Sequence, residues 1–94
     1  MKVRVRLFAV FREIAGTANV ILEFNNENIT VRDVIEKLKD SLNEKLYDMI
    51  MSTWERHSSI LILVNGHNIR LKEGLDTKIK DGDEIAIFPP GAGG

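Results

Sequence analysis

The end of the sequence, FPPGAGG, carries the residues whose types and spacing could do chemistry. Pro89 and Pro90 each fix their own φ, so the pair predicts a stiff, extended departure from the element before it. The four residues that follow have almost no side chains: Gly91, Ala92, Gly93 and Gly94. Such a segment could enter a channel of a partner protein that is wide enough only for backbone. The functional group would then be the carboxylate of the C-terminus itself.

A carboxylate needs activation before transfer, because it is a poor electrophile at neutral pH. The simplest route is an acyl-adenylate, formed on Gly94 by a separate enzyme that uses ATP. The chain has no glycine-rich phosphate loop, since its glycines are scattered. We therefore expect no catalysis by this chain alone and no bound cofactor, with ATP used by the activating enzyme. The alternative is a tail rich in glycine only because termini often are.

Composition narrows the classes of function. The 94 residues are enough for one domain with one small core. A net charge of −1, from 13 basic and 14 acidic side chains, gives no field that would recruit nucleic acid or an anionic membrane. The absence of cysteine excludes a disulfide framework and a thiolate site. With no apolar run near the roughly 20 residues that cross a bilayer and no signal-peptide pattern, we expect a cytoplasmic protein.

Apolar alternation in the first half predicts the elements that lead toward this tail. A first strand is predicted over 2–10 and a second over 20–24, joined by a short helical turn in FREIAG. Thr30 and Asp33 resemble a capping box with aspartate in place of the usual glutamate. An amphipathic helix is therefore predicted to begin at Val31.

The second half predicts a second, shorter helix that ends near Ser52, followed by TWERHSS, which has no clear pattern. ILILV, residues 60–64, is apolar on both faces, which suits a strand covered on both sides or one near the sheet centre. The dipeptide NG at 65–66 predicts a hairpin. We expect a brief strand or edge segment over 68–71 and the final strand over 84–88, ended by the proline pair.

The element order β-β-α-β-β predicts an α+β domain with a mixed sheet packed on one main helix. If the first and last strands are neighbours, they run parallel at the sheet centre, and the end of the chain leaves the sheet into solvent. That arrangement is the ubiquitin-like β-grasp fold. We expect a β-grasp domain over 1–88 and an extended, flexible tail over 89–94.

Four segments carry a resemblance to a known family: RLFAVFREIAG, ITVRDVIEKL, LVNGHNI and KDGDEIAIFPPGAGG. These segments resemble the MoaD/ThiS ubiquitin-like sulfur carriers, in particular the small subunits of molybdopterin synthase (MoaD). The resemblance covers nearly the whole chain. The most specific part of the resemblance is the C-terminal segment, which consists of DGDE, an apolar strand, Phe-Pro-Pro and a terminal Gly-Gly. Thiamine-pathway carriers share the Gly-Gly end but usually lack Phe-Pro-Pro, so the resemblance favours the molybdopterin branch.

The resemblance implies a reaction cycle on Gly94, the residue after Gly93. A ubiquitin-activating-like adenylyltransferase would adenylate Gly94, and sulfur would then replace one oxygen to give a thiocarboxylate. The large subunit of molybdopterin synthase would take in the tail, and the sulfur would pass to a pterin precursor in molybdenum cofactor biosynthesis. Three alternatives stay open: a ubiquitin-like modifier joined to protein lysines, a thiamine-pathway sulfur carrier and a plain β-grasp interaction module.

Phe8 and Phe88 predict a docking surface beside the tail. Phe8 shares a face of the first strand with Arg4 and Arg6, and Phe88 ends the last strand. If those strands are neighbours, the two rings lie close together, and an apolar patch beside an exiting tail would bind a partner. The resemblance also implies that these aromatic positions face the large subunit. The alternative is that both rings belong to the core. The full set of expected partner-binding residues is Phe8, Phe88, Pro89, Pro90, Gly91 and Ala92.

Other candidate sites have less support in the sequence. His57 beside Ser58 and Ser59 lacks an acid that would orient the ring for nucleophilic catalysis. His57 and His67 have no cysteine or matching carboxylate spacing, so we expect no metal site. The segment Met51 to Ser59 is longer and more irregular than in the shortest members of the family, and it could set the choice of partner.

Overall fold

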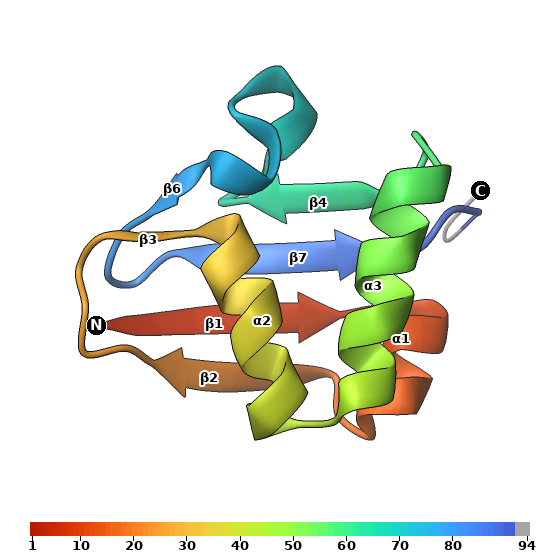
Figure 1. Ribbon diagram of the computed structural model, residues 1–94, viewed down its shortest axis with the longest axis horizontal. Helices are drawn as coiled ribbons and strands as arrows, with labels where there is room; N and C mark the ends of the chain where they lie inside the picture. The colour runs from red at the N-terminus through yellow and green to blue at the C-terminus, as the bar shows by residue number, and fades with distance from the viewer. Residues whose placement is uncertain (92–94) are drawn as a thin grey trace.

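Alternating apolar residues build a five-stranded mixed sheet in this computed structural model, which describes residues 1–91 (Figure 1). The strands lie in the order β2 (Asn19–Glu23), β1 (Lys2–Leu7), β7 (Glu84–Phe88), β4 (Leu61–Val64) and β5 (His67–Asn68). β1 and β7 are adjacent and parallel, as predicted, while the other neighbouring pairs are antiparallel. The first and last strands therefore run side by side and point toward the same end of the molecule.

Three helices supply the rest of the core: α1 (Ala9–Ala15), α2 (Val31–Ser41) and α3 (Glu44–Arg56). α2 and α3 cross one face of the sheet in Figure 1. Their apolar faces pack against the inward-facing side chains of the strands. The result is a core of fully buried residues from both layers, which includes Val5, Ile35, Ile50 and Ile62, each 0% exposed. In β1 the alternate residues are exposed, which leaves the opposite face of the sheet accessible to solvent. None of the helices within residues 1–91 has the length and apolar content to cross a membrane.

The first strand is shorter than predicted, because the chain turns at Phe8 and Ala9. β1 ends at Leu7 and α1 begins at Ala9, so the predicted strand over 2–10 is wrong for its last residues. Ala9 adopts a φ of 53°, in the left-handed region that costs an L residue roughly 1–2 kcal/mol. Neither glycine nor proline marks this turn in the sequence. In the sequence alone, the apolar alternation of the strand therefore continues through the turn to residue 10.

The second helical segment is longer than predicted. α3 runs for 13 residues to Arg56, whereas the sequence placed its end near Ser52 and left TWERHSS unassigned. Asn43 starts it, since its Oδ1 accepts a hydrogen bond from the Leu46 amide at 2.8 Å and its Nδ2 donates to the Ile14 carbonyl at 2.9 Å. The second helix was therefore predicted, but it is longer than the main helix α2 and not shorter.

A second, two-stranded sheet was not predicted. β3 (Ile29–Thr30) pairs antiparallel with β6 (Lys78–Ile79), and both strands have only two residues. Between β5 and β6 the chain forms two 3-10 helices, η1 (Ile69–Leu71) and η2 (Gly74–Asp76), so of the brief strand or edge segment expected over 68–71 only Asn68 lies in the edge strand β5. Elements this short carry too few positions for any apolar period to be recognised.

Candidate functional site

Two central strands bring Phe8 and Phe88 together at one end of the sheet. Leu7 is level with Ile87 in the parallel pair, so the residues that follow them are also neighbours. The two rings are stacked, with centroids 4.0 Å apart and planes 12° from parallel. The predicted proximity is confirmed, although Phe8 is the N-cap of α1 and not a strand residue. Its backbone remains extended, at φ −129° and ψ 152°, so the strand alternation still sets its direction.

Apolar residues of neighbouring strands extend this stack across the open face of the sheet. Leu61 is paired with Phe88 and Leu63 with Ala86, and paired residues direct their side chains to the same face. Both leucines and both phenylalanines are partly exposed. The two leucines were not predicted from the sequence to belong to this surface, because the apolar run ILILV suggested a strand buried on both faces. The apolar surface that results, here called the Phe8–Phe88 surface, consists of Phe8, Leu61, Leu63, Ala86 and Phe88.

A charged pair borders the Phe8–Phe88 surface. The Arg6 guanidinium lies 5.2 Å from the centre of the Phe8 ring, and its Nη1 is 3.4 Å from Oε1 of Glu84. Both charged side chains are well exposed, so the pair adds little to stability. An apolar centre with a charged edge is the general form of a protein interface.

The described part of the tail begins beside this surface. Pro89 is buried, Pro90 is partly exposed and Gly91 is exposed, so exposure rises over the three residues that follow the final strand. Gly91 has a φ of 80°, and a proline followed by such a glycine is typical of the centre of a type II turn. The chain therefore turns at Pro90 and Gly91 instead of continuing straight. The predicted roles of Ala92, Gly93 and Gly94 fall outside the described residues.

The other candidates are dispersed and show no shared chemistry. His57 is the C-cap of α3, and His67 lies on β5. Within residues 1–91 no three histidine, aspartate or glutamate side chains are placed to hold a metal ion. The acidic run near the start of β7 serves a turn, since Asp81 accepts a hydrogen bond from the Lys2 amide at 2.7 Å and Asp83 one from the Lys80 amide at 2.8 Å.

The architecture defines the class of protein. A mixed sheet with parallel central strands, one helix-covered face and a last strand that leads into the tail is the ubiquitin-like β-grasp fold. The α+β fold predicted from the sequence is therefore confirmed.

Solved structures of other proteins share this fold over almost the whole chain. Small archaeal modifier protein 1 from Methanosarcina acetivorans matches with a TM-score of 0.75 and 42% identity, over 99% of this chain and 96% of that one. A chain in the crystal structure of the Amycolatopsis orientalis BexX/CysO complex matches with a TM-score of 0.77 and 27% identity, over 98% of this chain and 99% of that one.

Sequence comparison then gives the family. Residues 5–94 match the ThiS family. The molybdopterin synthase sulfur carrier subunit of Dictyostelium discoideum is 34% identical over 91 residues, which cover 97% of this chain and 94% of that protein. The chain therefore belongs to the ThiS/MoaD family of ubiquitin-like sulfur carriers, as its motifs predicted.

Proposed function

We propose that this chain is the sulfur carrier subunit of a molybdopterin synthase, with the carboxylate of Gly94 as the group that carries sulfur. The chain supplies no catalytic side chain of its own in this proposal. An adenylyltransferase related to ubiquitin-activating enzymes charges it in the cytoplasm, and the large synthase subunit discharges it. Support comes from family membership, from the relative in Dictyostelium discoideum and from the Phe-Pro-Pro and Gly-Gly pattern at the close of the sequence.

The proposed chemistry has two steps before delivery. The Gly94 carboxylate attacks the α-phosphorus of ATP, which forms the acyl-adenylate and releases pyrophosphate. Sulfide from a donor then attacks the acyl carbon, a C–S bond forms, and AMP leaves with the C–O bond electrons. The resulting thiocarboxylate gives its sulfur to the pterin precursor, and water restores the carboxylate.

The Phe8–Phe88 surface is the observation that carries the proposal. A carrier must present its C-terminus to two enzymes in turn, so it needs a fixed docking patch close to a narrow terminal segment. The stacked rings lie next to Pro89, where the chain leaves the sheet. A partner that covers the Phe8–Phe88 surface would therefore have the last residues of the chain within reach of its active site.

Intact-mass measurement tests the charging step. We expect the protein, incubated with a matching activating enzyme, ATP and sulfide, to gain the mass that corresponds to exchange of one oxygen for sulfur. A variant without Gly94 serves as the control and should gain nothing. An unchanged mass with an enzyme that charges another carrier of this family would refute the proposal.

Delivery of sulfur tests the choice of acceptor. Charged protein mixed with the large synthase subunit and the pterin precursor should lose its thiocarboxylate mass and form the dithiolene product. If the charged protein instead retains its sulfur there but discharges to a thiazole precursor, the thiamine branch of the family is the correct assignment.

A second function, as a protein modifier, is favoured by the 42% identity to a small archaeal modifier protein. In that reaction the ε-amine of a lysine attacks the same acyl-adenylate, an amide bond forms and AMP leaves. Mass spectrometry of tryptic peptides from cells would then find lysines that carry residues 81–94 through the terminal glycine, because Lys80 is the last site in the chain that trypsin cleaves. The absence of such adducts, in cells where charged protein is present, would leave sulfur transfer as the function.

A further inference from the structure

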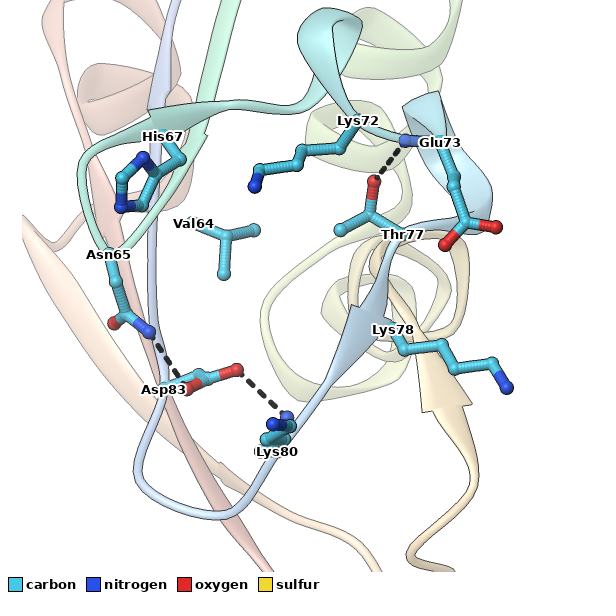
Figure 2. Close-up of a pocket in the computed structure, with 9 residues that line it drawn as sticks. All are labelled: Val64, Asn65, His67, Lys72, Glu73, Thr77, Lys78, Lys80 and Asp83. Carbon is cyan, nitrogen blue, oxygen red and sulfur yellow. Dashed lines mark hydrogen bonds between the residues drawn. The ribbon is translucent and has the colours of Figure 1, made fainter.

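An open cavity of about 360 Å³ lies at the end of the sheet opposite the Phe8–Phe88 surface. Figure 2 shows it between the β4–β5 turn, the segment of 3-10 helices and the start of β7. Phe88 ends β7, whereas this cavity adjoins Asp83, immediately before the same strand. The cavity is therefore separate from the Phe8–Phe88 surface and from the described start of the tail, residues 89–91.

Three side chains of the cavity wall already accept hydrogen bonds from donors of the protein. Asp83 accepts one hydrogen bond from Asn65 Nδ2 at 2.8 Å and another from the Lys80 amide at 2.8 Å, as the dashed lines in Figure 2 show. The Asn65 side-chain oxygen accepts from the Glu84 amide at 3.0 Å. Thr77 Oγ1 accepts from the Glu73 amide at 3.2 Å. These groups hold the wall in place and offer little to a bound cation.

The donors of the cavity remain available. Within residues 1–91, no hydrogen bond or ion pair engages the ammonium groups of Lys72 and Lys80 or the ring nitrogens of His67. In Figure 2 the Lys72 side chain extends toward His67 above Val64, and Lys80 lies on the opposite rim. The side chains of Lys78 and Glu73 point away from this space. Lys72 and His67 thus face each other across an apolar floor, and Lys80 lies at the opposite rim.

We propose that this cavity binds a phosphate group, either free or as a phosphomonoester. A multiply charged oxyanion has enough acceptor oxygens to engage both ammonium groups and the His67 ring at once. Lysine binds phosphate well as a point charge, and a hydrogen bond to a charged group is stronger than one between neutral groups. Once Lys78 and Glu73 are set aside because they point away, two lysines and one carboxylate remain, and the Asp83 oxygens already accept protein hydrogen bonds, so the site favours an anion.

Amide chemical shifts measured during titration of the full chain test this site. Inorganic phosphate and glycerol phosphate are added in separate experiments, with sodium chloride at matched ionic strength as the reference. We expect saturable shifts at Gly66, His67 and Lys80 and none at Phe88. Tighter binding of glycerol phosphate would identify a phosphomonoester as the ligand, and equal or tighter binding of inorganic phosphate would identify the free ion.

Substitutions distinguish coordination from general charge. The double variant Lys72→Ala, Lys80→Ala should bind at least about tenfold more weakly, since it removes both ammonium groups proposed to hold the anion. Lys78→Ala removes a nearby charge that points away from the cavity, so it should bind as the wild type does. Shifts that fail to saturate, that chloride reproduces, or that survive in the double variant would overturn the proposal. The site is independent of sulfur transfer, so the variant without Gly94 should retain it.

Discussion

Ile87 and Phe88 are neighbours in the sequence with opposite environments. Ile87 is 0% exposed beneath the helices, whereas Phe88 lies on the other face of the sheet in a stack with Phe8. At the scale of single residues, this alternation assigns one side chain to the core and the next to a surface. A substitution at Ile87 should therefore act mainly on folding, and one at Phe88 mainly on binding.

Phe8→Ala and Phe88→Ala should each weaken binding to the activating enzyme by about 2 kcal/mol, on the order of 30-fold. The loss in the free energy of unfolding should be smaller, about 1 kcal/mol, because both rings are partly exposed. Calorimetric titration measures the first quantity and urea denaturation the second.

Ile21→Ala is the matched control for the two phenylalanine variants. Ile21 is 49% exposed and pairs with Arg4, so it shares the open face of the sheet but belongs to the far strand β2. It should bind the enzyme as the wild type does. Equal binding by all three folded variants would show that the Phe8–Phe88 surface is not the docking site.

Asn65 combines a backbone and a side-chain requirement in one residue. Its φ is 50°, and its side chain bonds to both Glu84 and Asp83. Asn65→Gly should lower the free energy of unfolding by about 1 kcal/mol, because it keeps the turn and loses the side-chain bonds. Asn65→Ala should cost about 2 kcal/mol, since it loses the same bonds but keeps a Cβ in the left-handed region, which alanine tolerates less well than asparagine does. Equal losses in thermal denaturation would contradict the role of the backbone.

At the scale of elements, α2 shows how a local signal fixes the start of a helix. Thr30 and Asp33 form the predicted capping box: Asp33 Oδ2 accepts from the Thr30 amide at 2.9 Å, and Thr30 Oγ1 accepts from the Asp33 amide at 3.4 Å. Both partners lie within one turn of the chain, so the pattern is visible in the sequence.

Thr30→Ala should lower the free energy of unfolding by about 1 kcal/mol, because the amide at the third helical position loses its acceptor. Thr30→Ser keeps the hydroxyl and should retain most of that stability. Guanidinium denaturation of the two variants measures the difference. A serine variant as unstable as the alanine variant would attribute the effect to the lost methyl group.

α3 shows the opposite case, an element whose end depends on distant contacts. Trp54 packs against the core, and the Arg70 guanidinium lies 3.9 Å from the centre of its ring while also donating to the His57 carbonyl at 3.2 Å. Arg70 belongs to η1, which approaches α3 only in the folded chain. The predicted irregular stretch from Met51 to Ser59 is therefore helical through Arg56.

At the scale of the whole molecule, the sheet separates two surfaces. The Phe8–Phe88 surface and the described start of the tail, residues 89–91, are at one end, and the phosphate cavity is at the other. The core between them is continuous, and the buried residues of β1 and β7 are almost fully enclosed. Each end can thus be altered without loss of the other.

Deletion of Gly94 should abolish charging with sulfur and leave the thermal midpoint unchanged. The reason is that glycine has no side chain to bury, while the core of the described residues is built from positions 3–87. Differential scanning calorimetry beside the intact-mass assay measures both effects. A large fall in the midpoint would show that Gly94 also supports the fold.

The sequence by itself determined the features that depend on neighbours along the chain. Strand alternation in VRVRL, the capping box of Thr30 and Asp33, the Asn65 turn and the family motif around Phe88 are all local, so spacing and residue type suffice to predict them. The class of fold and the family followed from these signals.

Only the tertiary structure decided which distant residues meet. The turn at Ala9, the full length of α3, the addition of Leu61 and Leu63 to the docking surface and the cavity around Lys72 have no periodic signal. Each depends on strand pairing or packing between segments far apart in the sequence. Apolar periodicity tells which face of an element is buried, but the partner that buries it is chosen only when the whole chain folds.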